Sequence, residues 1–243
     1  PPPRPTDSTR LGASGAASNR SGSINPVTEI TQAAHRVGAL VFVDAVHLAP
    51  HRLLNVEAWD CDLLACSAYK FFGPHVGLLW GRRNLLESLK AYKLRPASNQ
   101  LPDKWMTGTG NHEGIAGVGE AIEYLADLGR DVDPTAESRR QALATAFRAI
   151  GDHERELSLG LLDGLVRLPG VTIHGITDAD LIDQRVATYS ITHDQLSPGE
   201  LAEHLARRGI FTWAGHHYAL PVTEALGLDP GGTLRIRPLH YNT

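Results

Sequence analysis

Residues 39–51, ALVFVDAVHLAPH, contain an apolar run typical of a buried strand, and the run ends at a carboxylate, Asp44. A second apolar run, CDLLACS at residues 61–67, is followed closely by Lys70. Strands as apolar as these are typical of a largely parallel sheet that is covered on both faces. Ligands of such sheets bind at the carboxyl ends of the strands. Asp44 and Lys70 are therefore expected to face one crevice.

The pair Asp44 and Lys70 has two interpretations. A lysine desolvated in a pocket can act as an amine nucleophile, and a buried acid can keep a ring nitrogen protonated. Pyridoxal phosphate (PLP) requires this combination: a lysine for a Schiff base and an acidic partner for its pyridine nitrogen. The second interpretation is a structural buried salt bridge. Taken alone, the two residues favour neither.

The pattern around these runs predicts the remaining elements. Asn25 and Pro26 are expected to start a helix that Gly38 ends, and a capping box is expected at Ser197 and Glu200. One long helix is predicted from Pro134 to Leu168, with a break near Gly151 or Gly160. Further helices are predicted near 84–91 and 113–128, and strands at 76–81 and near 171–174, 186–192, 210–213 and 233–237.

Three parts of the chain are expected. Residues 1–17 are rich in Pro, Gly, Ala and Ser and are expected to be disordered. Residues 18–150 are expected to form part of a large α/β domain with its connecting helix, and residues 151–243 a small α+β domain.

Composition excludes several classes of protein. The net charge of −4, without a basic run, argues against nucleic-acid binding. No apolar stretch approaches the roughly 20 residues that span a membrane. The two cysteines, Cys61 and Cys66, are expected to be free thiols in a reducing cytoplasm. None of the 12 histidines has the spacing of a zinc motif, so no metal site is expected.

Several motifs, in order, resemble the class V aminotransferase family of fold type I PLP enzymes, and most closely its cysteine desulfurase-like branch. They are NPVTEITQAAHRVGALVFVDAVHLAPH, CDLLACSAYKFFGPHVGLLWGRRNLL, GTGNHEGIAG, GHHYALP and LRIRPLHYNT. The resemblance implies an α/β fold with the mostly parallel sheet of a PLP-dependent transferase large domain, here incomplete, and a small α+β C-terminal domain. It also implies truncation at both ends, since family members have about a domain before Asn19 and a final helix after the point where this chain stops.

The resemblance also implies roles for individual residues. Lys70 matches the lysine that forms the Schiff base and moves protons at the substrate Cα, and Asp44 matches the acid that pairs with the pyridine nitrogen. The other cofactor-binding matches are His47 and Asn19 near the phenolic oxygen, Ser67 and Tyr69 at the phosphate, and Thr109 at the phosphate of a neighbouring subunit. Many relatives have His at the position of Tyr69.

Substrate binding is expected at the end of the chain. Arg235 matches the arginine that clamps the substrate carboxylate, and Arg237 takes this role if the register is shifted by one pleat. His217, or its neighbour His216, is expected to contact the substrate and help choose the reaction. In the desulfurase branch a nucleophilic Cys follows GHH, but here Tyr218 stands there, and a phenol cannot carry a persulfide.

The resulting hypothesis is a cytoplasmic, homodimeric PLP enzyme that acts on an amino acid by transamination, C–S or C–Se cleavage, or racemisation. The alternative is a catalytically inactive fragment or pseudoenzyme that keeps the fold as an interaction or structural protein. A third hypothesis is a metallohydrolase that uses His47, His51 and His75.

Overall fold

The computed structural model describes residues 5–243, and these form two compact units. The first unit contains the described residues up to Ala16 together with Pro26–Ala146, and the second contains Ala17–Asn25 together with Phe147–Thr243. The grouping differs from the sequence-based division at residues 17–25. Two backbone hydrogen bonds tie this short segment to later residues of the second unit: Ile24 N–H donates to Gln184 O (2.9 Å), and Val186 N–H donates to Gly22 O (2.9 Å).

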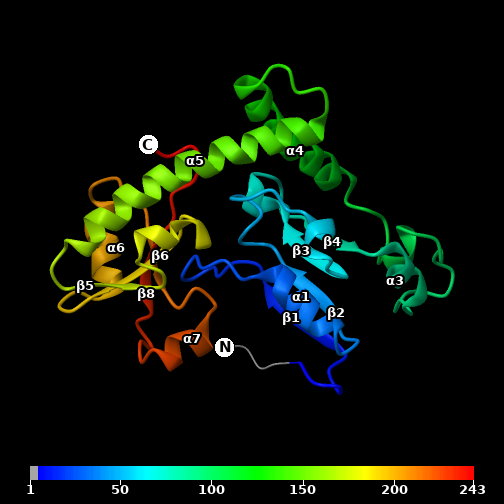
Figure 1. Ribbon diagram of the computed structural model, residues 1–243, viewed down its shortest axis with the longest axis horizontal. Coiled ribbons are helices and arrows are strands. Elements are labelled where there is room, and N and C mark those ends of the chain that lie inside the picture. The colour runs from blue at the N-terminus through cyan, green and yellow to red at the C-terminus, as the bar shows by residue number, and fades with distance from the viewer. Residues whose placement is uncertain (1–4) are drawn as a thin grey trace. The chain divides into compact units, whose positions relative to one another are not determined.

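The first unit is built on a four-stranded sheet (Figure 1). The first three strands are parallel, and the fourth runs antiparallel to the third. Helix α1 (Val27–His35) packs on the two strands at one side of this sheet. In sheet order, the strands are β1 (Leu11–Gly15), β2 (Leu40–Asp44), β3 (Leu63–Ser67) and β4 (Gly77–Gly81). The prediction of an α/β fold with a mostly parallel sheet is confirmed.

Strand β1 lies in the segment for which we expected disorder. Its five residues pair with all of β2, from Leu11 opposite Leu40 to Gly15 opposite Asp44. The expectation of disorder is therefore wrong for Leu11–Gly15. Composition misled because small residues bury little apolar surface by themselves, whereas a strand is also held by the backbone hydrogen bonds of its neighbour.

A small core anchors the turn that follows β3. Ala68 and Phe71, the ends of the 3₁₀ turn η1 (Ala68–Phe71), are buried against Ala49 and Val118. Tyr69 and Lys70 lie between these two anchors. The other elements of this unit are α2 (Val56–Trp59), α3 (Arg83–Ser88), η2 (Asp103–Trp105) and α4 (His112–Val132).

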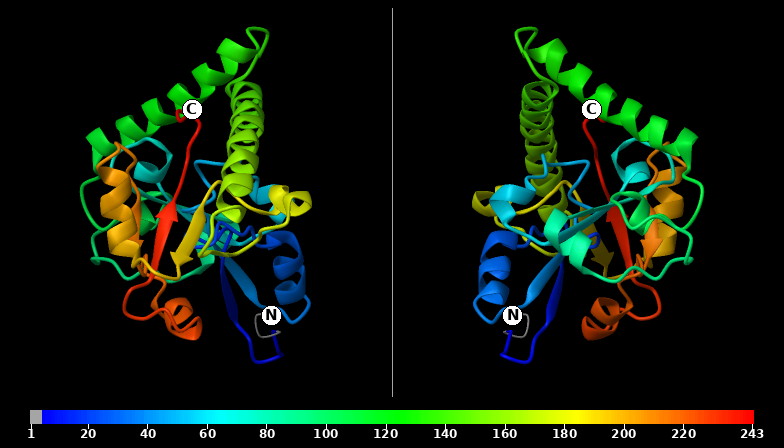
Figure 2. Two further views of the ribbon diagram at one scale, coloured as in Figure 1. Left: turned by 90° about the vertical axis from the view of Figure 1, so that its left-hand side faces the viewer. Right: turned by 90° about the vertical axis from the view of Figure 1, so that its right-hand side faces the viewer.

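Helix α5 (Arg139–Val166) is continuous, so the predicted break near Gly151 or Gly160 is wrong (Figures 1 and 2). A glycine inside a helix costs only about 1 kcal/mol relative to alanine. Burial of Ile150, Leu162 and Leu165 on the same helix offsets that cost. Among the helices of residues 5–243, none combines the length and the apolar character needed to cross a bilayer.

The second unit contains an antiparallel four-stranded sheet in the order β5-β6-β8-β7. The predicted capping box is confirmed: Ser197 and Glu200 bond each other's backbone N–H groups at the start of α6. The strands are β5 (Val171–His174), β6 (Tyr189–His193), β7 (Trp213–Gly215) and β8 (Thr233–Ile236), and the helical elements are η3 (Ala179–Gln184), α6 (Pro198–Ala206) and α7 (Leu220–Ala225).

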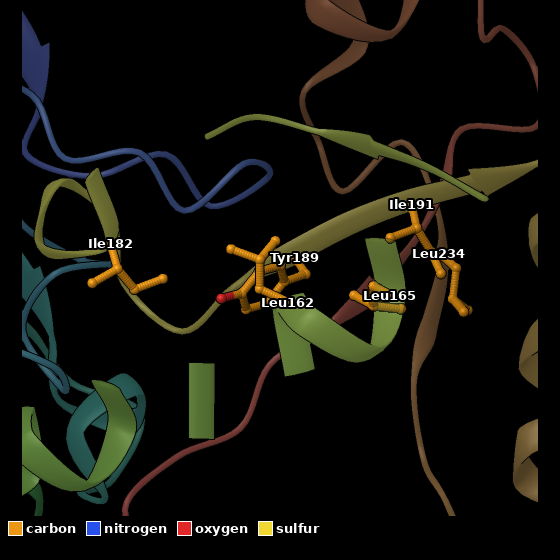
Figure 3. Close-up of a cluster of buried hydrophobic side chains, with 6 residues drawn as sticks. All are labelled: Leu162, Leu165, Ile182, Tyr189, Ile191 and Leu234. Atoms are coloured by element: carbon orange, nitrogen blue, oxygen red, sulfur yellow. The ribbon is translucent and has the colours of Figure 1, made fainter. Parts of the chain in front are cut away.

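The two faces of this sheet differ in character. One face carries the apolar core, in which Tyr189, Ile191 and Leu234 pack with side chains of α5 and Ile182 (Figure 3). Because side chains alternate along a strand, the residues between them point to the other face. Ser190, Arg235 and Trp213 lie side by side across β6, β8 and β7 on that second face.

We predict that Gly129→Ala destabilises the first unit, because a Cβ at this position of α4 would lie 1.8 Å from the carbonyl oxygen of Ala142 in α5. Overpacking against backbone costs at least about 2 kcal/mol. The matched control is Gly119→Ala on the same helix, where nothing lies within 4 Å. The control should gain about 0.5–1 kcal/mol from helix propensity. Urea unfolding of both variants measures the difference, and equal midpoints would contradict the close helix contact.

Candidate functional site

Two candidate cofactor residues of the first unit, Asp44 and Lys70, lie at the carboxyl ends of two neighbouring parallel strands. Asp44 is the last residue of β2 and pairs with Ala65 of β3. Lys70 lies in η1, immediately beyond the end of β3. Carboxyl ends of neighbouring parallel strands lie at the same edge of a sheet, so the chain places an acid and an amine at one edge.

Asp44 is exposed, and its Oδ1 accepts a hydrogen bond from Val46 N–H (2.9 Å). Within residues 5–243 no ion pair joins Asp44 to Lys70. A structural buried salt bridge is therefore not the role of this pair. The negative charge of Asp44, after burial, is the second cause that raises the pKa of the Cys66 thiol on β3.

Lys70 contacts the aromatic ring of its neighbour. Its Nζ lies 4.8 Å from the centroid of the Tyr69 ring, a cation–π distance. The Tyr69 ring in turn stacks on His75, with centroids 4.9 Å apart and planes inclined by 12°. A phenol and an imidazole therefore stand together beside the amine, although only Tyr69 was predicted to belong to this site.

The other predicted residues of this unit are His47, Ser67 and Thr109. His47 is 5% exposed and makes an edge contact with the ring of buried His51, with centroids 5.7 Å apart. Ser67 ends β3 and precedes η1. Thr109 is exposed in the loop before α4 and makes no side-chain hydrogen bond within residues 5–243.

The metallohydrolase hypothesis has no support in the described residues. Within residues 5–243, no three His, Cys, Asp or Glu side chains gather closely enough to hold a metal ion. His75, one of the three proposed ligands, stacks on Tyr69 instead.

The second unit brings together the three remaining predicted residues, Asn19, His217 and Arg235. Asn19 Nδ2 donates to the carbonyl oxygen of His217 (3.0 Å), and Arg235 Nη1 donates to the carbonyl oxygen of Asn19 (2.9 Å). The Arg235 guanidinium also lies 5.9 Å from the ring centroid of Trp213 on the neighbouring strand. Arg235 of β8 thus joins a cluster with Asn19 and His217.

His217 is buried and held neutral by its surroundings. Its Nε2 lies 3.2 Å from both the carbonyl oxygen and the hydroxyl of Thr233. Burial lowers the pKa of His217 to about 4, and the positive charge of Arg235 acts in the same direction. Burial also lowers the pKa of Arg235 itself, followed by repulsion from Arg237. A neutral imidazole among arginines leaves this region with a positive field that favours an anion.

The backbone around His217 is strained. His217 and Tyr218 have φ of +52° and +60°, a left-handed conformation that non-glycine residues rarely adopt. The Tyr218 N–H donates to Nδ1 of His216 (3.0 Å). This turn leaves the Tyr218 side chain 92% exposed.

Sequence reasoning missed two residues of the second unit, Arg20 and Trp213. Trp213 was overlooked because a single aromatic residue gives no periodic signal. Arg20 is 2% exposed and donates from Nη1 to the hydroxyl of Thr223 (2.5 Å). Its only sequence signal is a charged residue within a run of small and polar ones, next to the predicted Asn19.

Comparison with known proteins gives consistent results. A family model described as Aminotransferase class-V matches residues 5–243. A probable cysteine desulfurase of Halalkalibacterium halodurans is 32% identical over 98% of this chain and 55% of the relative. An aminotransferase-like protein of Gibberella zeae is 33% identical over 98% of this chain and 56% of the relative.

Solved structures share the fold. The apo structure of a cysteine desulfurase from Thermococcus onnurineus NA1 has a TM-score of 0.82 and 26% identity, covering 96% of this chain and 56% of that one. The chain thus spans about half the length of the relatives named here.

We predict that the second unit loses stability as the pH falls from 7 to 5. Unfolded histidine titrates near 6.5, whereas His217 in the folded unit titrates at about 4. Between these values the unfolded chain binds a proton that the folded chain does not, so stability is complete above pH 6.5 and falls below it. The expected loss from His217 is about 2 kcal/mol between pH 7 and 5.

Urea midpoints at the two pH values measure this loss. In His217→Gln most of the pH dependence should disappear, leaving a contribution from His174, whose pKa burial also lowers. The control His204→Gln, at an exposed position of α6, should keep the wild-type slope. An unchanged slope in His217→Gln would show that His217 does not titrate as described.

Proposed function

The chain belongs to the aminotransferase class-V family, and on that premise we propose that the protein is a PLP-dependent enzyme that acts on an amino acid. The observation that carries this proposal is the edge shared by Asp44 and Lys70. Asp44 ends one core strand and Lys70 lies just beyond the next, and no ion pair joins the two within residues 5–243. A purely structural role, as in the pseudoenzyme alternative, gives no reason to keep two unpaired functional groups at the ligand-binding edge of a sheet.

The residues at this edge fit the cofactor by their chemistry. Lys70 supplies an amine for the aldehyde carbon, and Asp44 supplies a carboxylate for the ring nitrogen. The hydroxyl groups of Ser67 and Tyr69 are donors suited to the phosphate. His47 and Asn19 are the residues proposed for the phenolic oxygen. When bound, PLP withdraws electrons from the substrate Cα and so makes its proton removable.

Each residue then has one task. Asp44 holds a proton at the ring nitrogen, because a carboxylate favours the charged form of a partner base. Lys70 moves the proton at the substrate Cα as a general base. Arg235 binds the substrate carboxylate, for which the planar guanidinium offers two parallel N–H donors. His217 stays neutral in this field and serves as a hydrogen-bonding rather than a charged group.

We further propose that no thiol of this chain carries sulfur during the reaction. Tyr218 stands where the resemblance places a cysteine, and the chain has only two cysteines elsewhere. Burial raises the pKa of both Cys61 and Cys66, which lowers the fraction of reactive thiolate at neutral pH. Transamination, racemisation or elimination to a released product remain as the proposed reactions.

The proposed assembly is a homodimer in the cytoplasm. Thr109 has a hydroxyl that bonds to nothing within residues 5–243, which suits a role at the phosphate of a second subunit. Sedimentation of the protein with and without PLP tests this part: a monomer under both conditions would contradict it.

We predict that incubation with PLP followed by borohydride reduction places one pyridoxyl group on Lys70, because reduction traps the cofactor on the amine that holds it. Peptide mapping by mass spectrometry locates the label. Lys70→Ala should abolish the specific label, whereas Lys90→Ala, at an exposed position in the same unit, should keep it. Labelling spread over many lysines, or unchanged in Lys70→Ala, would refute the assignment.

We also predict that Asp44→Asn, which keeps the shape of the side chain, weakens PLP binding about tenfold or more. The reason is the loss of a charge-assisted hydrogen bond, worth about 1.5–3 kcal/mol. A fluorescence titration gives the dissociation constant. Asp131→Asn, an exposed carboxylate of α4, is the control for the change in net charge. Equal affinity of Asp44→Asn and this control would remove Asp44 from the site.

A further inference from the structure

We propose that Arg20 is a positioning residue that holds the turn His216–Ala219, and with it Tyr218, through a hydrogen-bond chain across Thr223. The geometry of this chain lies entirely within the second unit. Its catalytic meaning rests on the proposed function, because the turn is the one expected to contact the substrate.

The chain of hydrogen bonds has two steps. Arg20 Nη1 donates to the hydroxyl of Thr223 (2.5 Å), and this hydroxyl donates to the carbonyl oxygen of Ala219 (3.1 Å). Ala219 follows directly after the left-handed pair His217 and Tyr218 and precedes α7. Within the pair itself, Asn19 Nδ2 donates to the carbonyl oxygen of His217. The adjacent residues Asn19 and Arg20 therefore hold two points of the turn: Asn19 bonds the carbonyl of His217 directly, and Arg20 reaches the carbonyl of Ala219 through Thr223.

The turn needs stabilising contacts because its backbone is strained. Each non-glycine residue in the left-handed region costs roughly 1–2 kcal/mol, and His217 and Tyr218 are consecutive. Such residues persist only where the surrounding structure holds them, and they gather at functional sites. Two further hydrogen bonds close the turn on itself, from Ala219 N–H to His216 O (2.8 Å) and from Tyr218 N–H to His216 Nδ1 (3.0 Å). Asn19 and Arg20 instead tie the closed turn to the rest of the unit, so loss of their contacts would let the turn and the Tyr218 side chain move.

Stability of the fold does not explain an arginine at position 20. Its side chain is buried, yet Nε and Nη2 find no hydrogen-bond acceptor among residues 5–243. Burial accordingly lowers the pKa of its guanidinium. A buried charge with so few partners is often less stable than an apolar side chain of similar size. The backbone of Arg20 is fixed separately, since the Ser190 hydroxyl donates to its carbonyl oxygen (2.7 Å).

The sharpest test uses Thr223→Val, which removes the hydroxyl without changing shape or charge. The readout is the titration of the His217 imidazole by NMR, because its pKa of about 4 depends first on burial in this turn. The charged and titratable groups around His217, namely Arg235, Arg20 and His216, are unchanged in this variant. Loosening of the turn should raise the pKa of His217 by about one unit, a tenfold change in its protonation equilibrium.

Two control variants define the effect. Thr223→Ser keeps the hydroxyl and should titrate like the wild type, and Val222→Ala changes an exposed neighbour on α7 and should do the same. An unchanged His217 titration in folded Thr223→Val would overturn the proposal.

If Thr223→Val does not fold, a double variant replaces it. In Thr223→Val the buried Arg20 Nη1 loses its acceptor, whereas the double variant removes the Arg20 donor together with the Thr223 hydroxyl. Arg20→Met with Thr223→Val should fold, and its His217 titration is compared with that of Arg20→Met alone, which carries the same charge. Both variants lack the chain that starts at Arg20, so the proposal predicts the same His217 pKa in the two, above that of the wild type, and an unfolding midpoint for Arg20→Met no lower than that of the wild type. A higher His217 pKa in the double variant than in Arg20→Met would contradict it, because the Thr223 hydroxyl would then hold the turn without Arg20; a large loss of stability in Arg20→Met would also contradict it. None of these readouts involves PLP, so they fail or succeed independently of Lys70 labelling.

Discussion

The parallel pairing of β2 with β3 is the constraint on which the candidate chemistry depends. It sets Asp44 opposite Ala65, and β3 then runs on into η1, where Lys70 lies. A carboxylate and an amine thereby reach the same edge, and within residues 5–243 no ion pair joins them. Had β3 run antiparallel to β2, its carboxyl end would lie at the other edge of the sheet, away from Asp44. Burial of Ala68 and Phe71 fixes the turn that carries Lys70, so the position of the amine follows from core packing.

In the second unit, the alternation of side chains along a strand decides which residues lie together. Leu234 enters the apolar core, and Arg235 therefore points to the face where Ser190 and Trp213 also lie. The segment containing Asn19 and Arg20 bonds to this face through Arg235 and Ser190. One face of a small sheet thus gives stability, and the opposite face gathers cationic and hydrogen-bonding groups. This division explains how a four-residue strand can serve both purposes.

The sequence predicted the parts of the fold and site that have a local signal. Asp44 and Lys70 were found because each interrupts or follows an apolar run, and the capping box because its spacing is fixed. The strand at Leu11–Gly15 was missed because its stability comes from pairing with a distant segment. Arg20 was missed for the same reason: its partners Thr223 and Ser190 are close only in the folded unit.

The guanidinium groups of Arg20 and Arg235 in the second unit act on the same neighbour, His217. Arg20 and Arg235 both act to keep His217 neutral, and neither forms an ion pair within residues 5–243. Arg20 is buried and Arg235 is half-buried, and desolvation of such groups without a counter-charge is unfavourable for folding. An anionic group bound on this face would supply that attraction in a partly desolvated setting, where it is stronger than in water. The desolvated guanidinium groups would therefore favour the carboxylate binding proposed for Arg235, and they lie in the same unit as the strained turn at His217 and Tyr218.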